Sequence, residues 1–467
     1  MARKPLGLDS MGVQKTMRLG DYLGDGLGQL PLNIMANLVG QLTYFYTEKV
    51  GLAAGMVATM LLVAKILDAF TDLIMGKIMD AGNSPKGKCR PWFLRMAVPA
   101  AVVIVLLFTV PRNAPGGVQA GYVLVTNILL SAVVYTALAI PYGALMAIRT
   151  KSQDERAKMG IFRTVFGYAA GMVIAILLIP ITNMLGGDQA AWIKIGVIFA
   201  AISLVSLLIL YKVTREQATE SIQPADSKNE DDVPFSQAIG YLFRNKCWVL
   251  MLCANLLVNI SYGLSAGGGT FYAKYILGND NLVGILGAVG LIPTLLGFIL
   301  VGPMAQKLGM RKACMVSCAI GAIACVARAF TPYSFYSCLI GGCFITFANI
   351  PMMCLFGAMV NSCVEYNEWK FGKRLVGMTN SASSFGAKIG SGIGGSLIGW
   401  MLAIAGYSAA AEIQPASVNV AIIGFSIYVP LLLFVGMFML LKFYDLEAKY
   451  PQIIADLQAR KESNTVK

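Results

Sequence analysis

Long apolar segments recur along the whole chain and are separated by short polar stretches. A helix needs about 20 apolar residues to cross a bilayer. Twelve segments are long enough, and they lie near residues 23–46, 56–79, 93–111, 121–147, 161–185, 191–211, 247–273, 281–305, 312–331, 334–360, 378–405 and 419–442. The pattern therefore predicts an all-α polytopic membrane protein with twelve transmembrane helices.

Related motifs appear in both halves of the chain. A segment that begins with Gly-Lys follows the second span and one that begins with Gly-Pro follows the eighth, and each contains several Lys or Arg residues. An Ile-Pro motif begins at Ile140 in the fourth span and at Ile350 in the tenth. Two related halves with a site near the midplane are typical of secondary transporters. We therefore predict an N-terminal six-helix half over 1–213, a polar linker over 214–236, a C-terminal six-helix half over 237–445 and a tail over 446–467.

Composition and charge support a membrane protein and give its orientation. The chain is 57% hydrophobic and 13% charged, with a mean hydropathy of +0.67. Of its 37 Lys and Arg residues we place 29 on one side of the membrane, four on the other and four inside spans. Positive charge accumulates in cytoplasmic loops. Both termini are therefore expected in the cytoplasm, and the net charge of +13 requires no nucleic-acid partner.

The second predicted span carries ionisable side chains where a lipid-facing helix carries none. Lys65, Asp68 and Asp72 share one helical face, with Thr71 beside them. Each charge near the bilayer centre costs about 2.5–3.5 kcal/mol, so this face must meet a cavity or partners. Carboxylate and hydroxyl oxygens suit a small hard cation or a proton. The alternative is a structural ion pair between helices.

Polar stripes run along several other predicted spans. In the first span Gln29, Asn33, Asn37 and Gln41 are each one helical turn apart, and Pro31 is expected to kink the helix. The other members are Tyr135 and Tyr142 in the fourth span, Asn259 in the seventh, and Asn380, Ser384 and Lys388 in the eleventh. Such groups line a water-filled cavity or bond between helices.

A short basic loop after the second span is a candidate gate, because Asp80 could pair with Lys88 or Arg90. The ten cysteines show no metal-type spacing and are expected to be reduced packing residues. The chain has no His, and no Ser or Cys stands beside a plausible base, so an enzyme is not expected. Met1–Arg18 is polar and basic, so no signal peptide is expected there.

Several motifs in this order and spacing resemble the glycoside-pentoside-hexuronide:cation symporters, a branch of the major facilitator fold. The resemblance covers nearly the whole chain. Its carriers are Tyr46-Thr47-Glu48, Lys65 to Asp72, Gly87-Lys-Cys-Arg-Pro-Trp92, Ile140-Pro-Tyr142, Arg163, Val364-Glu-Tyr-Asn-Glu-Trp-Lys370, Gly372-Lys-Arg374 and Lys388.

The resemblance implies a role for individual residues. Asp68 and Asp72 would hold the coupling cation, Thr136 would add an oxygen, and Lys388 would be the charge partner of that site. Arg163 would border the sugar, and the aromatic residue of the tenth span is Phe356. Galactoside-binding members carry an acid on the first span and another on the fourth. In this chain the fourth-span position is Ala139. The first-span position is Leu32, or Gln29 or Asn33 if the first helix is aligned with a shift.

The sequence also suggests a charge for the substrate. Lys65, Arg163 and Lys388 oppose only Asp68 and Asp72, so a bound monovalent cation would leave about two positive charges in excess. An anionic sugar, such as a glucuronide, hexuronide or sugar sulfonate, would offset them, since Arg binds carboxylates in a bidentate manner. If Arg163 pairs instead with an acid not counted here, a neutral pentoside or hexoside fits as well.

The function we predict is symport of a glycoside with H⁺ or Na⁺ by alternating access. No cofactor is expected besides that ion, no metal besides a bound Na⁺, and no partner besides the sugar and membrane lipid. The protein would be a monomer in a bacterial inner membrane. A major facilitator exporter of small molecules and a non-transporting receptor are the alternatives.

Overall fold

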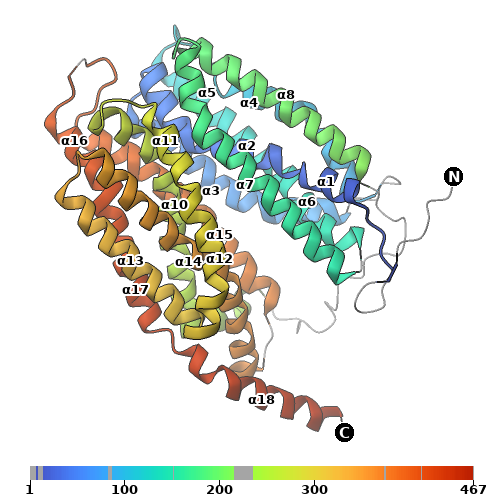
Figure 1. Cartoon of the computed structure of the whole chain (residues 1–467). Coiled ribbons are helices and arrows are strands. Elements are labelled where there is room, and N and C mark those ends of the chain that lie inside the picture. The colour runs from blue at the N-terminus through green and yellow to red at the C-terminus, as the bar shows by residue number, and fades with distance from the viewer. Residues whose placement is uncertain are drawn as a thin grey trace. The chain divides into compact units, whose positions relative to one another are not determined.

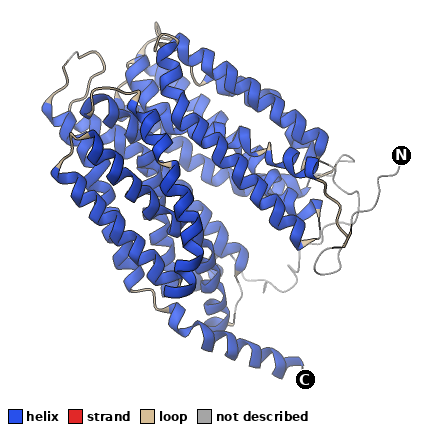
Figure 2. Ribbon diagram, in the orientation of Figure 1, coloured by secondary structure: helices blue, strands red, loops and turns tan. Residues whose placement is uncertain are grey.

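The structure is a computed structural model, and it describes residues 7–8, 14–81, 87–150, 152–214, 235–372, 375–411 and 413–465. Within these ranges the regular elements are helices, and the only bridge between extended residues joins Leu8 and Gln14 (Figure 2). The predicted all-α class is confirmed.

Contacts divide the chain into two compact units. The N-terminal unit comprises Met1–Ile222, Val283–Ile285 and Leu402–Gln414, and the C-terminal unit comprises Gln223–Leu282, Leu286–Met401 and Pro415–Lys467. Most of the predicted linker lies outside the described residues.

Figure 1 draws the helices of the N-terminal unit in blue to green. They are α1 (Leu19–Gly26), α2 (Gln29–Tyr44), the π-helical segment η1 (Phe45–Val50), α3 (Ala54–Ala81), α4 (Arg90–Leu106), α5 (Gly116–Ile128), the π-helical segment η2 (Leu129–Tyr135), α6 (Thr136–Arg149), α7 (Gln153–Met184) and α8 (Gln189–Val213). Within this unit α4 packs on α8, α2 on α7, and α3 on α5 and η2.

The C-terminal unit contains the remaining helices, with the middle of α11 assigned to the other unit. They are α9 (Phe235–Arg244), α10 (Lys246–Phe271), η4 (Tyr272–Ile276), α11 (Leu282–Val289), α12 (Leu291–Leu308), α13 (Met310–Phe330), α14 (Phe335–Phe371), α15 (Val376–Ile404), α16 (Ala416–Ile423), η5 (Gly424–Tyr428), α17 (Val429–Lys442) and α18 (Leu446–Thr465). Here α13 packs on α14 and α17, and α12 packs on α14.

Helix occupies each of the twelve predicted ranges, and nine helices of the described chain are long and apolar enough to cross a membrane. The other three ranges each differ from one long apolar helix. The first is broken between α1 and α2, α3 carries the ionisable group of Lys65, Asp68 and Asp72, and α4 has only 17 residues. These three ranges are helical, but none of them is one long and uniformly apolar helix.

The outer surface of each unit is apolar. In α8 the side chains of Val197, Ile198 and Val205 are half exposed, and in α4 Val98 is exposed to 61%. Apolar stripes of this kind are stable against hydrocarbon but costly against water. The exposed stripes are therefore the lipid-facing surface of a membrane protein.

The first predicted span is two helices, not one kinked helix. The break falls at Leu27 and Gly28, and Pro31 lies in the first turn of α2, where its missing N–H is tolerated. A Cβ at Gly28 would lie 2.6 Å from the Tyr142 ring, so the close approach of α6 requires glycine there. The expectation of a kink at Pro31 thus placed the irregularity one turn too late.

The C-terminal helix α18 packs on α14 of its own unit. Leu446 and Ile453 are buried, and the Trp369 indole donates to Asp456 Oδ2 at 2.8 Å. At its start, Glu447 accepts hydrogen bonds from the backbone N–H groups of Met310 and Arg311 at 2.7 and 2.9 Å. Glu447 therefore caps the N-terminus of α13, where a negative charge also favours the helix dipole.

We expect Glu447→Ala to lower the free energy of unfolding by about 1 kcal/mol, because the first amides of α13 lose their acceptor. Thermal unfolding of the purified protein in detergent measures the change. Lys449→Ala is the control, since it removes only an exposed ion pair with Asp445. An equal effect of both substitutions would contradict the capping role.

Candidate functional site

Two carboxylates and a hydroxyl meet inside the N-terminal unit. Asp68 of α3 is completely buried, and its Oδ2 lies 3.3 Å from the Lys65 Nζ. The Thr136 Oγ1 of α6 lies 3.1 Å from Asp68 Oδ1 and 2.9 Å from Asp72 Oδ1. The structure thus brings together four of the residues predicted for the cation site and its charge partner.

The π-helical segment η2 positions Thr136 in this cluster. Its wider turn places the Ser131 carbonyl 3.2 Å from Thr136 Oγ1, five residues back along the chain. The hydroxyl has one proton but three acceptor oxygens within hydrogen-bond distance. The hydroxyl can therefore donate to only one of these oxygens at a time, and a π-helical turn at such a place is common in functional sites.

Thr71, the fourth predicted oxygen ligand, is held differently. Its hydroxyl donates to the backbone carbonyl of Asp68 at 3.1 Å. The oxygen stays on the same helical turn as the two acids, but its proton is engaged within α3. Its contribution to a cation site stays a prediction.

Next to the acidic cluster, a cavity of about 310 Å³ opens within the N-terminal unit. Its walls come from α2, η2, α6 and α7, and they include five residues predicted to bind substrate. The lining residues are Gln29, Leu32, Asn33, Ala36, Tyr135, Ala139, Tyr142, Gly143 and Arg163. Because Tyr135 lines the cavity and its neighbour Thr136 belongs to the acidic cluster, η2 and α6 connect the two.

The amides of α2 are ordered by one another. Asn33 Nδ2 donates to Gln29 Oε1 at 3.0 Å, and Asn37 Nδ2 donates to the Asn33 carbonyl at 2.8 Å. The Asn37 side chain does not belong to the cavity wall. The polar stripe is therefore partly a chain of hydrogen bonds along one helix, with Gln29 and Asn33 at the cavity.

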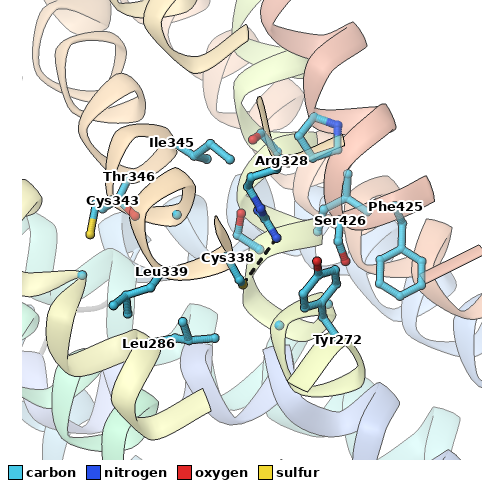
Figure 3. Close-up of a pocket in the computed structure, with 18 residues that line it drawn as sticks. Tyr272, Leu286, Arg328, Cys338, Leu339, Cys343, Ile345, Thr346, Phe425 and Ser426 are labelled. Carbon is cyan, nitrogen blue, oxygen red and sulfur yellow. Dashed lines mark hydrogen bonds between the residues drawn. The ribbon is translucent and has the colours of Figure 1, made fainter. Parts of the chain in front are cut away.

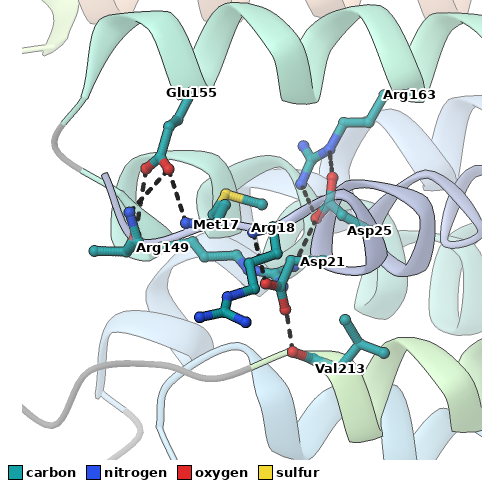
Figure 4. A network of polar contacts seen from close by, with 9 residues as sticks. Met17, Arg18, Asp21, Asp25, Arg149, Glu155, Arg163 and Val213 are labelled. Carbon is teal, nitrogen blue, oxygen red and sulfur yellow. Dashed lines mark hydrogen bonds and ion pairs between the residues drawn. The ribbon is translucent and has the colours of Figure 1, made fainter. Parts of the chain in front are cut away.

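Arg163 is neutralised by an acid that the sequence analysis did not count. Its Nε and Nη2 lie 2.7 and 3.0 Å from the two oxygens of Asp25, a bidentate pair with both side chains buried (Figure 4). The guanidinium carbon lies 3.8 Å from the centre of the Tyr142 ring. The Tyr142 hydroxyl donates to the Asp25 carbonyl at 2.8 Å. Arg163 is thus fixed at the cavity wall without bringing a net charge.

A second arginine completes this network. Arg149 Nη2 lies 3.3 Å from Asp21 Oδ1, and Arg149 Nη1 lies 3.6 Å from Asp25 Oδ1. Two acids and two arginines therefore balance. Nearby, Glu155 accepts from the backbone N–H groups of Thr16 and Met17 at 2.9 and 2.7 Å, which ties the segment before α1 to the start of α7.

A sequence signal for this network existed. Asp21 and Asp25 are four residues apart at the start of an apolar span, the same spacing that singled out Asp68 and Asp72. The predicted first span began at residue 23 and therefore contained Asp25. The five-residue charge count that favoured an anionic sugar was wrong because it left out Asp25, which cancels Arg163.

Four of the predicted residues of the C-terminal unit, Asn259, Phe356, Ser384 and Lys388, do not line the two cavities described in that unit. Asn259 Nδ2 donates to Asn255 Oδ1 at 2.8 Å, and Asn255 in turn donates to the Ser383 carbonyl at 2.6 Å. Phe356 and Lys388 are half-buried and Ser384 is exposed, while the side chain of Asn380 lies outside the described residues. Their roles in binding stay predictions.

The predicted gate is described only in part. The Asp80 side chain lies outside the described residues. Arg90 Nε donates to the Tyr211 carbonyl at 2.9 Å, and its guanidinium lies 4.4 Å from the centre of the Tyr211 ring. Lys88 is half-buried. Arg90 therefore links the start of α4 to the end of α8. All ten cysteines are free thiols, as expected.

Apolar helix exteriors, buried paired charges and a polar internal cavity define a polytopic membrane transporter. The chain belongs to the family of MFS/sugar transport proteins, whose model matches residues 24–448. It is 29% identical over 453 residues to the putative glycoside/cation symporter YagG of Escherichia coli, with 93% of each chain covered. It is 28% identical to the isoprimeverose transporter of Lactiplantibacillus pentosus, covering 93% of this chain and 90% of the relative.

Solved structures agree on the fold. A bacterial homologue of the human lysosomal transporter Spinster superposes with a TM-score of 0.67, covering 93% of this chain and 98% of the homologue. The two sequences are only 13% identical, so the likeness concerns the fold alone. The predicted membership of the major facilitator fold is confirmed, and these relatives and neighbours are transporters rather than enzymes.

We expect Asp25→Asn to destabilise the protein by about 3–5 kcal/mol, because it leaves two buried guanidinium groups without their shared carboxylate. The double variant Asp25→Asn with Arg163→Gln should be less damaged than Asp25→Asn alone, since one of the stranded charges is removed. Thermal unfolding in detergent measures both, with Asp445→Asn at an exposed pair as control. A double variant as unstable as the sum of its singles would contradict the pairing.

Proposed function

We propose that this protein is a symporter that couples the movement of a sugar or glycoside to that of a monovalent cation by alternating access. The family and the names of its relatives support transport of a sugar with a cation. The observation that carries coupling is the buried cluster of Asp68, Asp72 and Thr136, in which one hydroxyl proton faces several acceptor oxygens.

The charge of this cluster suits one monovalent cation. Asp68 and Asp72 place two carboxylates around the Thr136 hydroxyl, with Lys65 beside Asp68, and a bound H⁺ or Na⁺ would neutralise one of these carboxylates. Neutralisation matters because an uncompensated charge in a low-dielectric interior is costly. The cluster with a bound cation and the cluster without one would therefore favour different conformations of the protein. Coupling to transport requires such a difference. Lys388 is kept as a proposed charge partner.

The adjacent cavity offers the sugar hydrogen-bonding groups with little net charge. Gln29 and Asn33 provide amides, Tyr135 and Tyr142 provide aromatic faces, and the charge of Arg163 is cancelled by Asp25. Arg163 therefore brings no net charge that would attract an anionic sugar. We therefore favour a neutral glycoside or pentoside over an anionic sugar.

The setting of this activity follows from the charge distribution. Positive charge in the loops favours cytoplasmic termini, and the relatives of bacterial origin favour the inner membrane. The protein would act as a monomer, with no cofactor besides the coupling ion. Counterflow of labelled sugar in vesicles separates symport from a receptor, which would move nothing.

Asp68→Asn and Asp72→Asn are each expected to abolish uphill accumulation of sugar while sugar exchange survives better, because the cation loses a charged ligand. Uptake and exchange by proteoliposomes, with imposed Na⁺ or pH gradients, measure the two activities and identify the ion. Thr136→Val and Thr136→Ser form a matched pair: only Ser keeps the oxygen, so only Ser should keep coupling. Normal accumulation by Asp68→Asn would rule out the site.

The wild-type protein is expected to bind a glucoside at least as tightly as the corresponding glucuronide. Arg163→Gln should weaken the two to a similar degree, because Arg163 shapes the cavity with Asp25 instead of attracting an anion. Equilibrium binding of the matched sugars to the purified protein measures this. Selective binding of the glucuronide that Arg163→Gln abolishes would restore the anionic substrate.

A further inference from the structure

A second polar cavity lies inside the C-terminal unit. Its volume is about 210 Å³, and its walls come from α10, η4, α11, α13, α14, η5 and α17 (Figure 3). Ser261, Ser265 and Thr346 contribute hydroxyl groups, while Leu264 and Phe425 contribute apolar surface. The cavity is separate from the sugar pocket proposed above, because the lining residues of that pocket all belong to the N-terminal unit.

Arg328 of α13 points into this cavity and is 92% buried, its relative exposure being 8%. Its Nη2 lies 3.5 Å from the Cys338 Sγ, and its guanidinium carbon lies 5.2 Å from the centre of the Tyr272 ring. The Tyr272 hydroxyl also lies within hydrogen-bonding reach of the guanidinium. A thiol, a neutral phenol and an aromatic ring compensate a buried positive charge only in part. Among the described residues no carboxylate forms an ion pair with Arg328.

Two polar atoms at the cavity have no partner in the structure. One is Arg328 Nε and the other is Ser426 Oγ. The side chain of Arg328 also packs directly on Gly341. A Cβ at that position would overlap Arg328 Cγ and Cδ, so the arginine occupies the room that the glycine leaves. A buried cation with an unused N–H donor, kept pointing into an open space, is unstable unless an anion reaches it.

In the N-terminal unit, aromatic side chains fill the place that corresponds to this cavity in chain order. There, Phe45 begins the π-helical segment at the end of the first span, and Phe108 follows the third span. The rings of Phe45 and Phe108 lie 5.1 Å apart, and each lies within 5.6 Å of the ring of Trp192. In the C-terminal unit Tyr272 begins the matching π-helical segment, but Arg328 and a cavity replace the aromatic cluster. Aromatic side chains can therefore close a helix bundle at such a place, so the cavity is not an unavoidable result of helix packing.

We propose that the cavity around Arg328 is a binding site for a small organic oxyanion, a carboxylate in the simplest case. The guanidinium would bind the two oxygens through parallel hydrogen bonds that include Nε, and Ser426 Oγ would donate a third. The apolar part of the ligand would contact Leu264 and Phe425. Cys343 also lines a neighbouring cavity of about 310 Å³ with apolar walls, which would accept a longer tail.

The probe for this site is hexanoate, compared with hexan-1-ol, which carries a similar tail without the charge. Thermal unfolding of the full-length protein in nanodiscs of zwitterionic lipid is measured at fixed sodium concentration and ionic strength. Hexanoate is expected to raise the unfolding temperature of wild type in a saturable manner, because a ligand that binds only the native state stabilises it. Hexan-1-ol should have a much smaller effect.

Arg328→Gln is expected to weaken hexanoate binding at least about tenfold, since it removes the charge and the paired donors. The matched control is Arg95→Gln, which removes an exposed arginine that also lies over an aromatic ring, 5.8 Å from the centre of Trp92. Arg328→Lys keeps the charge but loses the planar pair of donors, so its affinity should be intermediate. This variant keeps the test available if Arg328→Gln does not fold.

Nanodiscs with anionic lipid separate the two sources of such a ligand. If anionic lipid alone stabilises wild type and competes with hexanoate, the oxyanion is supplied by a lipid headgroup; if it does not, the ligand is a free carboxylate. Both results support the site. Equal stabilisation by hexanoate and hexan-1-ol, or an unchanged response in Arg328→Gln, would overturn it. Neither outcome bears on coupling at Asp68 and Asp72.

Discussion

A charged side chain inside an apolar helix bundle is stable only where an opposite charge or several hydrogen bonds reach it. This constraint explains the interior of the N-terminal unit. Asp25 holds Arg163 through two hydrogen bonds and shares its charge with Arg149, and Asp68 lies against Lys65. The pairs made by Asp25 join α1 to α6 and α7, and the Thr136 hydroxyl joins α6 to the two acids of α3.

Irregular backbone accompanies each polar site. The break between α1 and α2 places Asp25 at the end of a short helix, next to the Tyr142 ring and the close contact at Gly28. The π-helical turn of η2 brings the Ser131 carbonyl to Thr136. In a regular helix the Ser131 carbonyl would point along the helix axis and accept from a backbone N–H of the same helix. Departures from regularity therefore supply oxygens and space to a bundle that would otherwise be closed and apolar.

The two units use similar helices for different interiors. Near the π-helical end of its first span, the N-terminal unit packs Phe45, Phe108 and Trp192 together, whereas the C-terminal unit holds Arg328 beside a cavity. Cation coupling and sugar binding are proposed only for the first unit's cluster and cavity. Both units are helical, and the side chains near these π-helical segments decide what each unit can bind.

The sequence by itself determined the features that depend on local spacing. Apolar length predicted the helices, and the four-residue step from Asp68 to Asp72 placed both acids on one face of α3, because helical periodicity needs only neighbours in the chain. Thr136 required the resemblance to a family. Tertiary structure alone decided that Asp25 pairs with Arg163, 138 residues away, and that Arg328 is buried with no acid paired to it among the described residues. Such pairings depend on where helices break and how they are rotated against their neighbours, and the spacing of residues along one helix carries no information about either.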